Sequence, residues 1–311
     1  MEIETKFNNR IQGLANRIHE GFNELSIEEA RKELLLWISW TQGINALKLR
    51  LSPPNLDETT WQEVEIFAEK RSQGIPFAYI MGKTEFYGLE LTIGPGVLIP
   101  RPETEELVEI ALEWLEKHIQ SGMPEIRILD LCTGSGCIAV AIGHTLQERI
   151  RNQKLPSVKL TISLSDSSSQ ALNYARANAN RYGSSELEFR MFQGDMMNPF
   201  KEQDASAFDL IVCNPPYVHP DETSALSAET YMHEPAEALF HPDPPALYLQ
   251  ILKQCMEFLN ADGLIILELS PFISEAVLSM CEQEFPECYY RIESDLSGKD
   301  RFLIFACKPR R

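Results

Sequence analysis

The sequence predicts an α/β fold, in which a mostly parallel sheet of seven strands follows a small helical bundle and a β-hairpin linker. From about residue 122 onward, short apolar runs rich in Ile, Leu and Val alternate with longer amphipathic runs. This alternation is typical of parallel strands that are buried on both faces by the helices between them. Before residue 83, apolar residues recur at helical spacing instead.

Residues 1–82 are expected to form the helical domain. Ser26-Ile27-Glu28-Glu29 has the capping-box pattern, which starts a helix through Leu34 and Ile38. A second amphipathic run spans residues 56–72, and Gly74 and Pro76 follow it as helix breakers. The first domain is therefore expected to end near residue 82.

Residues 83–100 are expected to form the β-hairpin linker. Residues 86–93 alternate like a strand, Gly94-Pro95-Gly96 is a turn signal, and residues 97–99 begin a second strand. Residues 101–311 then form the predicted sheet domain, which begins with a helix after Pro102.

The sheet domain is expected to alternate strands and helices. The strands are predicted at 126–131, 159–164, 187–192, 208–213, 263–269, 289–292 and 301–307. The helices are predicted at 137–146, 168–181, 245–259 and 273–285. Because no helix separates the last two strands, one of them is expected to be antiparallel.

Composition narrows the functional class. The net charge of −18 repels phosphate backbones and argues against binding to nucleic acid. The chain shows no secretory signal and no long apolar run, so we expect a cytoplasmic protein without a membrane span. Seven cysteines, none in a C-x-x-C pair, argue against zinc and against a disulfide framework, and no metal site is expected. The basic run Lys308-Pro309-Arg310-Arg311 is expected to be a solvated tail.

A glycine loop follows the first predicted strand, in the run Asp130-Leu131-Cys132-Thr133-Gly134-Ser135-Gly136. Two glycines let the backbone approach a ligand, and the helix that follows offers free N–H groups. The third glycine of the dinucleotide fingerprint is absent, and no P-loop lysine follows. The loop therefore favours a nucleoside ligand without a pyrophosphate or triphosphate.

Two carboxylates follow the next strands. Asp166 follows the second strand, where a carboxylate typically holds ribose hydroxyls, and Asp195 follows the third, where it can flank an adenine. Either one alone is better explained as a helix cap or a turn residue. Together with the glycine loop they favour an acidic nucleoside site, and S-adenosylmethionine, a cationic sulfonium, is the expected cofactor.

Asn214-Pro215-Pro216-Tyr217 follows the fourth strand. Proline fixes its own φ and makes the residue before it extended, so this corner is stiff. It presents an amide, free carbonyl oxygens and an aromatic ring. One interpretation is a strand that ends at proline, with tyrosine on the surface. The other is a clamp for a planar NH₂ group: Asn214 and the Pro215 carbonyl accept its hydrogens, and Tyr217 packs on its plane.

The chain resembles the HemK/PrmC-type release factor glutamine methyltransferases, which are protein-(glutamine-N5) methyltransferases. The motifs that carry this resemblance extend from about residue 70 to the end of the chain. They include Gly74-Ile75-Pro76-Phe77, Leu98-Ile99-Pro100-Arg101-Pro102-Glu103-Thr104-Glu105, the glycine loop, Asn214-Pro215-Pro216-Tyr217, Glu234-Pro235-Ala236-Glu237-Ala238-Leu239-Phe240, Gly263-Leu264-Ile265-Ile266-Leu267-Glu268 and Asp295-Leu296-Ser297-Gly298-Lys299-Asp300-Arg301.

The resemblance implies a Rossmann-like class I methyltransferase fold. Its implied substrate is the glutamine of the Gly-Gly-Gln motif in class I peptide chain release factors. Residues 132–136, Asp166, Met196 and Asn214 would contact the cofactor, and residues 214–217 would contact the glutamine. Cys132 departs from the family, which usually has glycine there.

Two alternatives stay open. One is an adenine-N6 or guanine-N2 methyltransferase acting on nucleic acid, which shares the Asn-Pro-Pro-Tyr corner but is disfavoured by the acidic charge. The other is a cofactor-binding module without activity. The helical domain either docks the partner or is a stabilising cap. The roles of Arg101, Glu268 and the loop histidines His219, His233 and His241 are left open.

Overall fold

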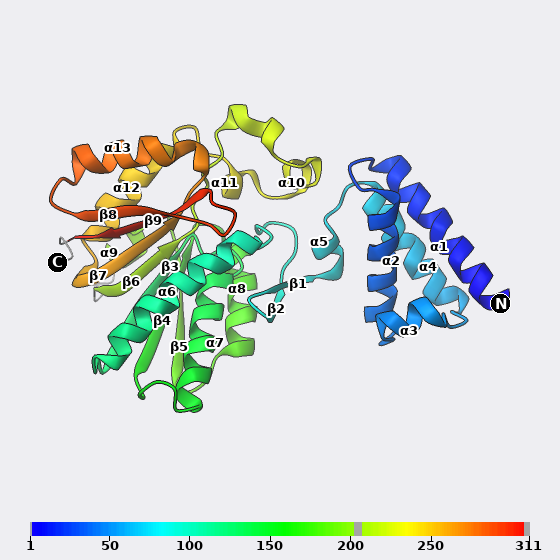
Figure 1. Ribbon diagram of the computed structural model, residues 1–311, viewed down its shortest axis with the longest axis horizontal. Helices are drawn as coiled ribbons and strands as arrows, with labels where there is room; N and C mark the ends of the chain where they lie inside the picture. The colour runs from blue at the N-terminus through cyan, green and yellow to red at the C-terminus, as the bar shows by residue number, and fades with distance from the viewer. Residues whose placement is uncertain (1, 202–206, 308–311) are drawn as a thin grey trace. The chain divides into compact units, whose positions relative to one another are not determined.

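The fold is described from a computed structural model that covers residues 2–201 and 207–307 (Figure 1). The basic run 308–311 lies outside these residues. The chain divides into two compact units, one made of Met1–Lys83 with Ser224–Glu234, and the other of Thr84–Thr223 with Pro235–Arg311. Among the described residues, no helix is both long and apolar enough to cross a membrane.

The first unit is helical, as the sequence predicts. Its helices are α1 (Glu2–Gly21), α2 (Ile27–Thr41), α3 (Ala46–Leu51), α4 (Glu58–Ser72), α5 (Phe77–Met81) and, from the second segment, α10 (Ala228–His233). The capping box at Ser26 is present, because the Ser26 hydroxyl accepts from the Glu29 N–H and the Glu29 carboxylate accepts from the Ser26 N–H. The apolar faces of α1, α2 and α4 meet in a core of their own.

The hairpin exists, but its predicted position was wrong. Strands β1 (Lys83–Phe86) and β2 (Leu89–Thr92) pair through a turn at Tyr87 and Gly88, and residues 97–99 form no strand. Both turn residues have positive φ, at 52° and 71°. Gly88 supplied a turn signal, but Tyr87 did not, because tyrosine seldom adopts positive φ.

The second unit contains a mostly parallel sheet. In the described residues its seven strands have the order β5-β4-β3-β6-β7-β9-β8. They are β3 (Glu125–Leu131), β4 (Lys159–Asp166), β5 (Leu187–Gln193), β6 (Phe208–Cys213), β7 (Leu259–Glu268), β8 (Tyr289–Ser294) and β9 (Asp300–Ala306). Strand β9 runs antiparallel to both of its neighbours, which confirms the expectation for the last two strands.

Helices cover both faces of the sheet (Figure 1). Alternate strand residues point to opposite faces, so Ile128 packs with one core and Leu129 with the other. The first core is completed by α6 (Pro102–Gln120), α7 (Cys137–Arg151) and α8 (Ser169–Tyr182), and the second by α12 (Pro244–Met256), α13 (Ser274–Glu284) and α9 (Asn198–Lys201). The short elements α11 (Ala236–Leu239), η1 (Pro220–Ala225) and η2 (Pro271–Ile273) lie in the connections.

The strand order reverses between β3 and β6. From β3 the chain adds β4 and β5 on one side and then returns to add β6 and β7 on the other. The loops after β3 and β6 therefore diverge and leave a crevice at the carboxyl ends of the strands, which is where open α/β sheets bind ligands.

Candidate active site

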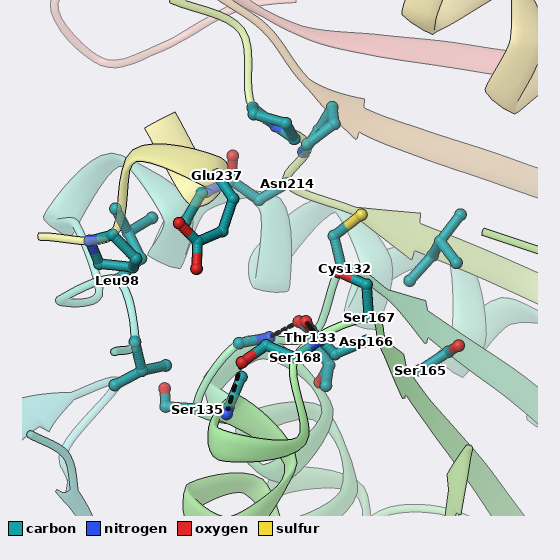
Figure 2. Close-up of a pocket in the computed structure, with 18 of the residues that line it drawn as sticks. Leu98, Cys132, Thr133, Ser135, Ser165, Asp166, Ser167, Ser168, Asn214 and Glu237 are labelled. Atoms are coloured by element: carbon teal, nitrogen blue, oxygen red, sulfur yellow. Dashed lines mark hydrogen bonds between the residues drawn. The ribbon is translucent and has the colours of Figure 1, made fainter. Parts of the chain in front are cut away.

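A cavity of about 290 Å³ lies at this crevice, and all of its lining residues belong to the second unit (Figure 2). The loops after β3, β4, β5 and β6 all contribute to its wall. The predicted site residues on this wall are Cys132, Thr133, Gly134, Ser135, Asp166, Asp195, Met196, Asn214, Pro215 and Pro216. Four motifs that are far apart in the sequence thus meet at one cavity.

Three of the predicted site residues, Asp130, Gly136 and Tyr217, are absent from this wall. Asp130 is fully buried beneath the glycine loop, where its Oδ2 accepts from the Thr133 hydroxyl at 2.6 Å and the Ala139 N–H at 3.1 Å. Gly136 is the N-cap residue of α7, with φ 77°, and a Cβ there would lie 3.1 Å from Leu164 and 3.2 Å from Ala175. Both residues therefore shape the loop from behind.

Asp166 connects the glycine loop to the end of β4 through hydrogen bonds. Its Oδ2 accepts the Gly134 N–H at 2.9 Å, and its Oδ1 accepts the Ser168 N–H at 2.9 Å. Burial raises its pKa, while these N–H groups lower it and the nearby Glu237 carboxylate raises it. Each oxygen still has a lone pair for a ligand hydroxyl.

The cavity wall is acidic. Asp166, Asp195 and Glu237 all line it, with Arg101 as a cationic side chain among the lining residues. Glu237 comes from α11 and lies across the cavity from the glycine loop in Figure 2. Carboxylates around a cavity favour a cationic ligand by charge.

Cys132 and Met196 have φ values of 56° and 46°, in the left-handed region that favours glycine. Cys132 thus adopts a backbone conformation that suits glycine, the residue that the resemblance implies at this position. Its thiol packs beside the second core.

Tyr217 turns away from the cavity. Its hydroxyl donates to Glu268 Oε1 at 3.2 Å, and its ring packs against the second core. Its pKa is raised, first by burial and next by the Glu268 charge. The predicted packing of Tyr217 on a substrate amide stays a prediction.

Thr104, which itself lines the cavity, connects Asn214 to the buried Glu268. The Asn214 Nδ2 donates to Thr104 Oγ1 at 3.4 Å, and Thr104 donates to Glu268 Oε2 at 2.7 Å. Burial raises the pKa of Glu268, against hydrogen bonds from Thr104 and Tyr217 that lower it. Thr104 stands in the motif 98–105 that carries the family resemblance, but no role was predicted for it, because a threonine in the first turn of a helix is ordinarily interpreted as part of the cap.

The loop histidines lie in different places. His241 lines the cavity, and its Nδ1 accepts from the Asp243 N–H. His219 accepts from the Asp221 N–H in its own loop, and His233 belongs to the first unit, with its Nε2 3.2 Å from the Gln73 carbonyl.

The seven-stranded sheet and its carboxyl-end cavity define a methyltransferase-type fold. Residues 105–243 match the model of the "Methyltransferase small domain" family, and residues 15–82 match the model of the "PrmC N-terminal domain". In fold the chain is similar to the crystal structure of the hMettl16 catalytic domain in complex with MAT2A 3′UTR hairpin 6. The TM-score is 0.51, with 16% identity over 72% of this chain and 77% of that chain.

Curated relatives define the family. The chain is 36% identical to a release factor glutamine methyltransferase of Thermodesulfovibrio yellowstonii, over 84% of this chain and 87% of the relative. It is 32% identical to those of Leptospira interrogans, over 94% and 96%, and Bacillus subtilis, over 90% and 92%. The chain belongs to the release factor glutamine methyltransferase family.

Proposed function

We propose that this protein transfers a methyl group from S-adenosylmethionine to the side-chain amide nitrogen of the glutamine in the Gly-Gly-Gln motif of class I peptide chain release factors, in the cytoplasm. The observation that carries the proposal is that Asn214, Pro215 and Pro216 line the same cavity as the glycine loop and Asp166. The predicted acceptor clamp and the predicted nucleoside site would thus open into one cavity. The names of the relatives support the choice of substrate.

The residues present fit the cofactor. Residues 132–135, Asp166, Asp195, Met196 and Asn214 would hold it, with Asp130 and Gly136 acting through the loop that they shape. The three cavity carboxylates suit its positive charge, and the left-handed Gly134 and Gly136 bring loop backbone close to the cavity. S-adenosylmethionine supplies an electrophilic methyl group on its sulfonium.

An amide nitrogen is a poor nucleophile because its lone pair is delocalised into the carbonyl. Asn214 Oδ1 and the Pro215 carbonyl oxygen would each accept one of its hydrogens, which orients the nitrogen and stabilises the positive charge that develops on it. Holding two reactants in line can lower the activation free energy by about 7–11 kcal/mol. The methylated amide cation is strongly acidic, so its proton passes to water.

The test uses a methyl-tritiated donor with three acceptors: a class I release factor, total RNA and DNA. We expect label on the release factor, mapped by mass spectrometry to the glutamine of Gly-Gly-Gln. Label confined to RNA or DNA would replace this function with nucleic-acid methylation. No label on any of the three would favour a binding module without activity.

Two variants separate the roles within the site. Asn214→Ala is expected to lower kcat by about 10²–10³-fold, the cost of deleting one preorganised hydrogen-bonding group, with much less effect on cofactor affinity. Asp166→Ala is expected to weaken cofactor binding first, measured by calorimetry. Near-normal methylation by Asn214→Ala, or unchanged affinity in Asp166→Ala, would refute the corresponding role.

A further inference from the structure

Hydrogen bonds run from Asn214 to two residues outside the Asn-Pro-Pro-Tyr loop. The Asn214 Nδ2 lies 3.4 Å from Thr104 Oγ1, and Thr104 Oγ1 lies 2.7 Å from Glu268 Oε2. The second oxygen of Glu268 accepts from the Tyr217 hydroxyl at 3.2 Å. Thr104 and Glu268 are each only 1% exposed, so water cannot substitute for these bonds.

The chemistry of Asn214, Thr104 and Glu268 determines which atom carries the hydrogen in each of these hydrogen bonds. Both carboxyl oxygens of Glu268 accept from hydroxyl groups, one from Thr104 and one from Tyr217. A threonine hydroxyl has a single hydrogen to donate. Glu268 therefore takes the Thr104 hydrogen. Thr104 is left with lone pairs toward Asn214 and can only accept from it.

This polarity decides which end of the Asn214 amide faces Thr104. The oxygen and the NH₂ group of an amide have nearly the same shape, so packing alone does not distinguish them. An accepting Thr104 holds the NH₂ group and leaves Oδ1 for another donor. In the opposite orientation, Asn214 would present its NH₂ to the NH₂ of a glutamine, and two donors form no hydrogen bond.

We propose that Thr104 and Glu268 are positioning residues that orient the Asn214 amide so that its oxygen accepts from the substrate NH₂ group. This inference rests on the proposed function. The end of β7 is itself fixed, because the Tyr248 hydroxyl donates to the Glu268 backbone carbonyl. The Glu268 carboxyl, which accepts the Thr104 hydrogen, therefore lies on a fixed part of the backbone.

A purely structural role would have a different signature. Thr104 lies in the first turn of α6 and Glu268 at the end of β7, so their bond also joins these two elements. A structural bond contributes to stability, whereas an orienting bond contributes to kcat. The two roles are therefore separable by comparing turnover, cofactor affinity and unfolding in the same variants.

The experiment measures methylation of a class I release factor by three threonine variants. Thr104→Val keeps the shape and removes the hydroxyl, and we expect kcat to fall about ten- to a hundredfold while the Kd for S-adenosylmethionine stays within about twofold. Thr104→Ser restores the hydroxyl and is expected to recover kcat to within about threefold. Thr161→Val is the matched control, because the Thr161 hydroxyl on β4 is buried with no hydrogen-bond partner among the described residues.

Glu268→Gln provides a second test of the inference in case the Thr104→Val variant does not fold. It keeps the volume but turns one acceptor into a donor, so one of the two hydroxyls must reorient, and kcat is expected to fall at least about fivefold. The inference is overturned if both variants keep wild-type kcat, or if Thr104→Ser is as slow as Thr104→Val. If the wild-type enzyme itself does not label the release factor, the proposed function fails instead.

Discussion

Two sets of buried polar groups, Arg71 in the helical unit and Glu268 with Asp130 in the sheet unit, have different kinds of partner. In the helical unit Arg71, only 1% exposed, lies between two carboxylates. Its Nε and Nη2 donate to Glu33 at 2.6 and 3.1 Å, Nη2 also lies 3.4 Å from Glu229, and Nη1 donates to the Ile75 carbonyl. In the sheet unit the buried Glu268 and Asp130 accept hydrogen bonds from hydroxyl and backbone N–H groups.

This difference distinguishes a structural cluster from a functional one. The Arg71 cluster joins α4, α2 and α10, and α10 comes from the separate segment Ser224–Glu234. Opposite charges compensate each other there, so removing one leaves others uncompensated. In the sheet unit, hydroxyl and N–H dipoles contact Asp130 and Glu268. They fix the directions of the hydrogen bonds, but burial still raises the pKa of both carboxyls.

The strongest test of this contrast is Arg71→Met. It removes the cation and leaves Glu33 and Glu229 together in a partly buried place. We expect a loss of about 3–5 kcal/mol in the free energy of unfolding at pH 8, measured by urea denaturation. Part of it should return at pH 5, because burial raises the pKa of Glu33 and Arg71 opposes that rise, so removing Arg71 lets the carboxyl take up a proton more readily.

The matched control is Lys32→Met on α2. Lys32 pairs with Glu28 at 2.9 Å on the surface, with exposed fractions of 54% and 79%. An exposed pair of this kind contributes about 0–1 kcal/mol. If Arg71→Met cost no more than Lys32→Met, the Arg71 cluster would not be structural.

Asp130→Asn tests the other half of the contrast. Burial raises the pKa of Asp130 from 3.8 to about 7. The stabilisation from the bound proton is then fully present below pH 3.8 and is lost as the pH rises to about 7. The whole change is on the order of 4 kcal/mol at most.

Asparagine cannot titrate, and its carbonyl can still accept from Thr133 and Ala139. Asp130→Asn should therefore flatten the fall in stability between pH 3.8 and about pH 7, measured by thermal or urea unfolding at each pH. The exposed Asp262 on β7 supplies the control Asp262→Asn, which should leave the slope as in the wild type. An unchanged slope in Asp130→Asn would contradict the raised pKa.

Glu229→Gln tests the weaker of the two ion pairs that Arg71 makes. Glu229 lies 3.4 Å from Arg71 and is 27% exposed, whereas Glu33 makes two shorter bonds. We expect a loss of about 1 kcal/mol. Because this bond holds the segment Ser224–Glu234 on α4, limited proteolysis should cut that segment faster in the variant. Equal cleavage rates would show that other contacts hold the segment.

The sequence predicted the sheet well, because its signals are local. Buried strands such as Phe208–Cys213 are unbroken apolar runs, and the helices between them repeat at helical spacing. The hairpin was misplaced because its turn uses Tyr87 in a left-handed conformation, against the preference of that residue type. The grouping of Ser224–Glu234 with the helical unit depends on contacts with Arg71 and Glu24 that no local pattern records.

The site was predictable where residues follow strand ends. Asp166, Asp195 and Asn214 could be placed together because parallel strands end at one edge. Thr104 and Glu268 could not be paired, because they are 164 residues apart and meet only when α6 packs beside β7. Sequence order also could not show that Tyr217 turns its hydroxyl to Glu268.

The two units also differ in backbone strain. The left-handed residues recorded in the described part of the helical unit are glycines, at 43, 74 and 82, whereas the sheet unit has Cys132 and Met196 in this conformation at its cavity. A left-handed non-glycine residue costs about 1–2 kcal/mol. Cys132→Gly removes that strain but also removes partly buried side-chain contacts and adds freedom to the unfolded chain. We therefore expect a net change in unfolding free energy below about 1 kcal/mol.

Cys132→Val is the matched counterpart, because a β-branched residue tolerates positive φ poorly. We expect it to lose about 2 kcal/mol of stability and to bind S-adenosylmethionine more weakly, whereas Cys132→Gly keeps its affinity. Urea unfolding and calorimetry on both variants measure this. If the valine variant matched the wild type in both, the loop would have relaxed away from φ 56°, and Cys132 would carry no strain.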